Sequence, residues 1–168
     1  GIYQLRGLSL ANMTIVEGAT GLIVIDTLYG ADVARAALEL YFAHRPRKPV
    51  TALIYTHSHT DHYGGARGVA REEDVASGAT RVFAPAGFME AVVSESVTGG
   101  NAMARRAQYQ FGVPVPRNER GNIDAGLGKM DRTGRGSGGL FAPTDTIEQP
   151  VETRTIDGVT IVFQLAPR

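Results

Sequence analysis

The hydrophobic and polar positions of the chain follow two periods, one typical of strands and one typical of helices. Two short runs rich in β-branched residues, 13–16 and 21–26, flank a turn-like stretch at 17–20, which predicts an antiparallel hairpin. From residue 31 to 42, apolar side chains recur at helical spacing, which predicts an amphipathic helix. Residues 50–55 are almost wholly apolar, as expected of a central strand that is covered on both faces.

The second half of the chain continues this alternation. Its pattern predicts the start of a helix at 66–73, a strand at 81–84, and a helical region at 88–111 that is interrupted at Gly99 and Gly100. Residues 117–139 lack hydrophobic periodicity and are expected to form a long loop, of the kind that is usually functional or mobile. Asp157 and Gly158 lie between β-prone flanks and predict a hairpin turn within 153–165. The alternation of strands and helices favours a layered α/β architecture.

Composition narrows the class of protein. The length of 168 residues fits one domain, residues 1–168, and 43% hydrophobic with 20% charged residues is typical of a globular chain. Seventeen basic residues balance seventeen acidic ones, so the chain has no net positive charge that would attract nucleic acid. No apolar run is long enough to span a membrane. Because the first residue is Gly1 and not methionine, we expect the translation start to lie upstream. The absence of cysteine excludes disulfides and thiolate ligands.

The chemistry concentrates where the central strand ends. Three of the four histidines, His57, His59 and His62, lie within six residues and surround Asp61. His57 and His59 are two apart, so in an extended segment both side chains point to one side and can meet one cation. Asp61 and His62 are adjacent and are expected to diverge, toward a second cation or a second face of the first. Imidazoles with a carboxylate suit zinc, and suit iron or manganese less well.

An alternative interpretation is a polar loop whose histidines merely cap or titrate. The specific spacing at the exit of a strand argues against it, and Gly64 and Gly65 would let the backbone turn closely beneath a metal.

Two glycine-rich segments are candidates for nucleotide-binding motifs. Residues 134–139 fit G-x-G-x-x-G, but neither a strand nor a helix flanks them, so we expect plain loop. Gly128 and Lys129 lack the other residues of a phosphate loop, so no nucleotide site is expected.

Residues 56–65 resemble the signature loop of the metallo-β-lactamase superfamily. Five further segments, 12–14, 100–107, 124–129, 142–145 and 155–159, together resemble the zinc-dependent alkylsulfatases, which hydrolyse detergents such as dodecyl sulfate. The resemblance covers nearly the whole chain and implies an αββα sandwich, which is α/β (α+β) in class. For function, it implies a sulfuric ester hydrolase that acts on alkyl sulfates.

The resemblance also implies roles for single residues. It makes His57 and His59 ligands of one zinc ion and Asp61 and His62 ligands of a second, so that Asp61 belongs to the catalytic centre. A water or hydroxide between the two metals would be the nucleophile, because two cations lower its pKa.

An alkyl sulfate further requires donors for its sulfate oxygens. Asn101, Arg105 and Arg106 could provide them if their segment is helical, although either arginine could equally be a surface ion-pair residue. The family resemblance also implies a homodimer, and relatives that act on external detergents are often exported to the periplasm or secreted.

The chain departs from this family in one respect. Alkylsulfatases complete their two-zinc site with two glutamates and a histidine that follow the last strand seen here, but no histidine follows His62. We therefore expect an incomplete sandwich that needs the remaining polypeptide of the enzyme for activity and to cover one sheet face. Glu148 and Glu152 are the late glutamates, but in the family that position is an ordinary strand connection, which disfavours them as ligands.

Two other functions stay open at this point. The same scaffold and metals can activate water against an ester, a thioester or a lactam. The chain could also be a non-catalytic metal-binding or assembly module.

Overall fold

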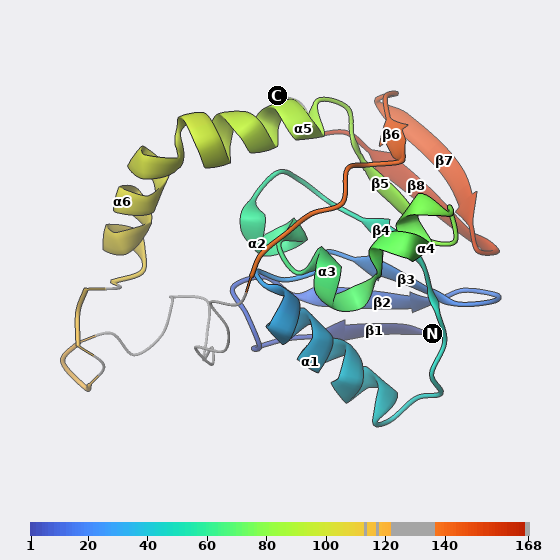
Figure 1. The fold of residues 1–168 in the computed structure, drawn as a ribbon, viewed down its shortest axis with the longest axis horizontal. Helices are drawn as coiled ribbons and strands as arrows, with labels where there is room; N and C mark the ends of the chain where they lie inside the picture. The colour runs from blue at the N-terminus through green and yellow to red at the C-terminus, as the bar shows by residue number, and fades with distance from the viewer. Residues whose placement is uncertain (113, 117, 122–136, 167–168) are drawn as a thin grey trace.

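A six-stranded mixed sheet forms the centre of the structure (Figure 1). The computed structural model describes residues 1–112, 114–116, 118–121 and 137–166. The sheet has the order β1 (Ile2–Leu5), β2 (Met13–Glu17), β3 (Leu22–Ile25), β4 (Val50–Ile54), β5 (Arg81–Pro85) and β6 (Asp145–Ile147). Strands β1, β2 and β3 pair antiparallel, whereas β3, β4, β5 and β6 pair parallel.

Helices connect the parallel strands, as such crossovers require. They are α1 (Ala31–Phe42), α2 (Thr60–Tyr63), α3 (Ala66–Val69), α4 (Glu72–Ala76), α5 (Phe88–Val92), the π-helix η1 (Val93–Thr98) and α6 (Gly100–Gln110). A separate antiparallel hairpin follows, made of β7 (Val151–Ile156) and β8 (Val159–Gln164). Among the described residues, no helix has the length and apolar character needed to cross a membrane.

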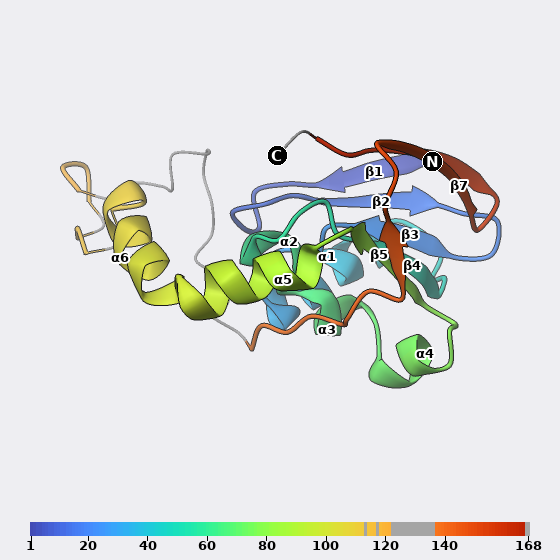
Figure 2. The ribbon, with the colours of Figure 1, turned by 90° about the horizontal axis from the view of Figure 1, so that it is seen from above.

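The helices and the hairpin cover opposite faces of the sheet, as Figure 2 shows. Adjacent residues of β4 point to opposite faces, so Leu53 joins the core beneath α1 and α3, while Ile54 joins a smaller core beneath the hairpin. Helix α1 buries one stripe of its surface, which includes Val33, Ala37 and Tyr41, against the first core. The predicted layered α/β class is confirmed.

Most predicted elements are confirmed at nearly the predicted bounds. The hairpin of β2 and β3, the helix from Ala31 to Phe42 and the strands β4 and β5 all form where the pattern indicated. The turn between β7 and β8 has positive φ at Asp157 (45°) and Gly158 (78°), which is the geometry that this residue pair favours in hairpins.

Three regions differ from the predicted elements or lie largely outside the described residues. The helix expected at 66–73 is two short helices, because Ala70 and Arg71 have extended backbone between α3 and α4. Strand β6 was not predicted, since three residues carry too little pattern to distinguish a strand. Most of the predicted loop at 117–139 lies outside the described residues, including the glycine motif at 128–129 and the first half of the motif at 134–139.

Candidate metal centre

The histidine cluster lies at the carboxyl end of β4, where ligands of open α/β sheets commonly bind. His57 lies in the loop after β4, His59 precedes α2, and Asp61 and His62 lie on that single helical turn. The ring centroids of His57 and His59 are 4.6 Å apart, and those of His57 and His62 are 4.0 Å apart. The predicted proximity of His57 and His59 is therefore confirmed, and His62 lies beside them.

Hydrogen-bond partners orient two of these rings. Nδ1 of His57 lies 3.0 Å from Oγ1 of Thr56, and Nδ1 of His62 lies 2.6 Å from Oδ2 of Asp26. In each ring Nε2 is then the nitrogen that remains for a ligand. The predicted divergence of Asp61 and His62 is wrong, because Oδ2 of Asp61 lies 3.5 Å from Nε2 of His62. Both side chains reach back from the one-turn helix α2 toward the same space.

Asp26 is a site residue that sequence reasoning missed. Its carboxylate contacts His62 and also accepts hydrogen bonds from the backbone N–H of Thr56 (2.9 Å) and from Oγ1 of Thr56 (2.8 Å to Oδ2). It is buried, with 7% exposure, and has a left-handed backbone (φ 57°) that aspartate tolerates. The available signal is an acid at the end of an otherwise apolar strand, but the pattern of residues 21–26 predicts only half of a hairpin.

Backbone hydrogen bonds after β3 hold the histidine loop, residues 56–65, against the sheet. The N–H of Thr27 donates to the carbonyl of His62 (2.7 Å), and the N–H of Gly65 donates to the carbonyl of Leu28 (2.9 Å). A Cβ at Gly65 would overlap the carbonyl oxygen of Thr27 and lie 2.6 Å from Cβ of Ala34, so only glycine fits without movement. Leu28 is fully buried with φ 64°, a strained conformation that costs about 1–3 kcal/mol.

The local environment shifts the pKa values of His57 and His62 in opposite directions. Burial lowers the pKa of His57, and the neighbouring His62 and His59 lower it further, which favours the neutral imidazole, the form that binds metals. Burial also acts to lower the pKa of His62, but the hydrogen bond and charge of Asp26, together with the charge of Asp61, outweigh it and raise that pKa.

The donor chemistry of the cluster fits a divalent cation, since three imidazoles and a carboxylate share one small region. Their geometry does not yet form a closed shell. Within the described part of the chain, no three histidine or acidic side chains are arranged to hold an ion. The four side chains are thus a partial ligand set.

The predicted substrate donors lie elsewhere. Asn101, Arg105 and Arg106 are exposed on α6, which extends away from α2 in both views (Figures 1 and 2). The helical context expected for them is confirmed, but none of the contacts of the histidine cluster given above involves them. Their role in substrate binding stays a prediction. Glu152 accepts hydrogen bonds from the backbone N–H groups of Glu148 and Gln149, so it has a structural part in the strand connection.

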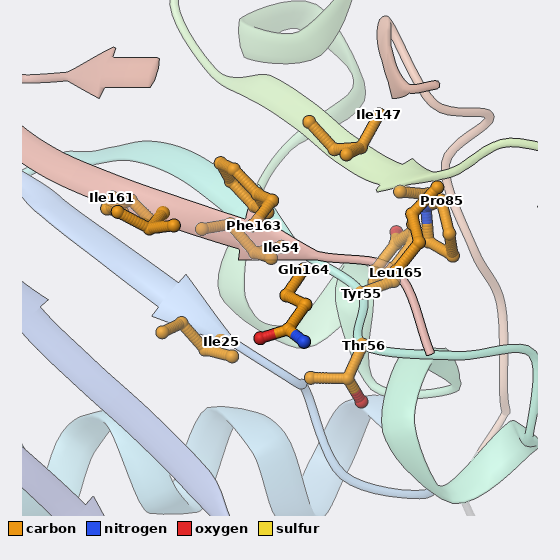
Figure 3. Close-up of a pocket in the computed structure, with 12 residues that line it drawn as sticks. Ile25, Ile54, Tyr55, Thr56, Pro85, Ile147, Ile161, Phe163, Gln164 and Leu165 are labelled. Atoms are coloured by element: carbon orange, nitrogen blue, oxygen red, sulfur yellow. The ribbon is translucent and has the colours of Figure 1, made fainter. Parts of the chain in front are cut away.

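A pocket of about 270 Å³ opens between the ends of the central strands and β8 (Figure 3). Its walls are mainly apolar and include Ile54, Ile147, Phe163 and Leu165. Thr56 also lines it, so one residue connects the pocket to the hydrogen bonds of His57 and Asp26.

Residues 6–147 match the family model of the metallo-β-lactamase superfamily, and this range includes the whole histidine loop. The chain belongs to this superfamily. It is 55% identical over 99% of its length to the alkyl/aryl-sulfatase BDS1 of Saccharomyces cerevisiae, and 56% identical over 98% to the (R)-specific secondary-alkylsulfatase of a Pseudomonas species. A solved structure, the stereoselective inverting sec-alkylsulfatase Pisa1 from Pseudomonas sp., superposes with a TM-score of 0.90 at 56% identity over 98% of the chain.

These relatives are much longer than the present sequence. The chain spans 25% of each of the two curated sulfatases and 26% of the solved structure. The family resemblance inferred from residues 56–65 is confirmed, and so is the similarity to alkylsulfatases.

Proposed function

We propose that this chain provides part of the catalytic centre of a metal-dependent hydrolase that cleaves alkyl sulfate esters. The observation that carries the proposal is the cluster of three imidazoles with Asp61, oriented by Asp26 and Thr56, in a chain 56% identical to a secondary-alkylsulfatase. The proposed ions are two zincs, held on this side by His57, His59, Asp61 and His62. When bound, such ions supply a hydroxide near neutral pH and stabilise charge on the substrate.

The residues of this chain have separable tasks in that proposal. His57 and His62 present Nε2, because Thr56 and Asp26 hold their Nδ1 atoms. Asp61 supplies a carboxylate oxygen next to Nε2 of His62. Burial lowers the pKa of His57, which favours the neutral ring that can act as a ligand. These tasks concern binding and orientation, which bring the reacting groups together at little entropic cost.

The proposed reaction needs partners for this set. Four side chains are too few to close two metal sites, so we place the remaining ligands in the additional polypeptide by which the relatives exceed this chain. Asn101, Arg105 and Arg106 remain candidate donors to the sulfate group, and a homodimer remains the candidate assembly.

Release of inorganic sulfate from dodecyl sulfate by the full-length protein tests the proposal. We expect turnover that a chelator abolishes and zinc restores, and that His57→Ala or Asp61→Asn reduces to background. His44→Ala is the matched control, since His44 is the histidine outside the cluster and is exposed beyond α1. Full activity in the cluster variants would refute the proposal.

The same assay separates the other functions. Hydrolysis of an ester, thioester or lactam without sulfate release would assign the scaffold to a different substrate. Tight zinc binding with no hydrolysis of any of these would indicate a non-catalytic metal-binding module.

A further inference from the structure

The π-helix η1 contacts the histidine loop, residues 56–65, through side chains. Oε2 of Glu95 accepts a hydrogen bond from Oγ of Ser58 (3.2 Å) and lies 3.7 Å from Nε2 of His59. The next residue, Ser96, lies with its Oγ 3.2 Å from the hydroxyl of Tyr63. Two consecutive residues of η1 therefore contact both ends of the loop.

A π-helix is an informative place for such contacts. A π-turn has poorer backbone geometry than an α-helix, and it occurs often at functional sites. Here it occupies residues 93–98 of the helical stretch between Phe88 and Gln110, just before the break at Gly99, and two of its residues contact the histidine loop. The sequence pattern predicted helix over this region but gave no function to Glu95.

Glu95 lies beside the third imidazole, at a longer distance than the oxygens that hold the other two rings. His57 and His62 each have an oxygen atom beside one ring nitrogen, from Thr56 and Asp26 respectively. For His59 that oxygen is Oε2 of Glu95, and it faces Nε2 rather than Nδ1. Histidines that bind metals nearly always donate their second ring N–H to such an oxygen, which fixes the ring and makes the ligating nitrogen more basic.

We propose that Glu95 is a positioning residue for His59: its carboxylate accepts the Nε2–H of this ring, so that Nδ1 is the nitrogen presented to the metal ion. The inference rests on the proposed function in that it requires a metal at the histidine loop, but it does not depend on which substrate is hydrolysed. Ser58 supports the arrangement by donating to the same carboxylate oxygen.

Zinc affinity of the full-length protein, measured by competition with a chromophoric chelator, tests this role. We expect Glu95→Ala to weaken binding about 10–100-fold, the usual effect of removing an outer partner of a ligating histidine. Glu95→Gln should recover most of the affinity, because its amide oxygen can still accept the N–H. Glu90→Ala is the matched control, an exposed glutamate one turn earlier on the same helical stretch, and should bind as wild type.

Two further measurements separate positioning from other roles. The melting temperature of the metal-free Glu95→Ala variant should stay near that of wild type, since exposed ion pairs contribute little stability. A crystal structure of the zinc-bound protein should show His59 bound through Nδ1, with Nε2 within hydrogen-bond distance of Glu95.

The outcomes distinguish this inference from the proposed function. Unchanged zinc affinity in Glu95→Ala, or coordination of His59 through Nε2, would overturn the inference even if alkyl sulfates are hydrolysed. Equal losses in the Ala and Gln variants would also overturn it, because they would make Glu95 a direct ligand. If sulfate esters are not cleaved but zinc binding depends on Glu95 as described, the inference stands without the proposed function.

Discussion

The two faces of the central sheet are built very differently. Beneath α1 and α3 lies a continuous core whose members, such as Leu22, Val24 and Leu53, are fully buried. The opposite face is covered by the β7–β8 hairpin, where partly buried and exposed side chains alternate along β8 and Val162 remains 63% exposed. The histidine loop is anchored to the helix side through Gly65 and Tyr63, while the pocket opens on the hairpin side. The comparison indicates that the helix-covered face anchors the candidate ligands, and we expect the hairpin-covered face to be easier to perturb.

The largest expected effect comes from adjacent residues of β4 that point to the two faces. Leu53→Ala should reduce the free energy of unfolding by about 2–5 kcal/mol, because a cavity in a sealed core cannot relax fully. Ile54→Ala should cost less, since Ile54 already borders the pocket of about 270 Å³. Denaturant unfolding of both variants measures the difference. Equal losses would show that the hairpin seals its face as well as the helices do.

The next largest loss of stability is expected where the histidine loop contacts α1. Gly65→Ala should cost about 1–3 kcal/mol and weaken metal binding, because the added methyl group has no space between Thr27 and Ala34. Gly100→Ala is the control, since a Cβ there has no neighbour within 4 Å and alanine favours the helix. Thermal unfolding and zinc titration of both variants test this. A stable Gly65→Ala protein with normal affinity would mean that the loop can move away from α1 at no cost.

A smaller effect is expected where the hairpin is attached to the sheet. The carboxylate of Asp157 accepts hydrogen bonds from the N–H and hydroxyl of Thr20, the N–H of Gly21 and the hydroxyl of Thr51, at 2.7–3.1 Å. Asp157→Asn should cost about 1–2 kcal/mol, because the amide retains only one of two acceptor oxygens. Asn also tolerates the positive φ of this turn, so backbone strain is not a second cause. Proteolysis near the hairpin should increase, and an unchanged digestion rate would argue against this attachment.

The smallest expected effect is that the loss of unfolding free energy caused by Asp157→Asn depends on pH. Burial acts to raise the pKa of Asp157, but hydrogen bonds from Thr20, Gly21 and Thr51 outweigh it and lower the pKa below its ordinary 3.8. A lowered folded-state pKa stabilises the fold above pH 3.8, and this contribution is lost as pH falls through the folded value. The stability difference between wild type and Asp157→Asn should therefore shrink from neutral to strongly acidic pH. A difference independent of pH would exclude the charge as its source.

The sequence by itself determined the elements whose patterns are local. The spacing of apolar residues predicted α1 to the residue, and Asp157 with Gly158 predicted the hairpin turn, because helix periodicity and turn geometry depend on neighbours in the chain. The histidine loop was likewise visible, since its four candidate ligands lie within six residues.

Only the tertiary structure decided which residues orient those ligands. Asp26 reaches His62 across 36 positions, and Glu95 reaches Ser58 across 37. Neither contact leaves a periodic signal, because each depends on how β3, η1 and the loop after β4 come together in space. The path of α6 away from the loop was equally undetermined, since a helical pattern gives a direction to side chains but not to the helix itself.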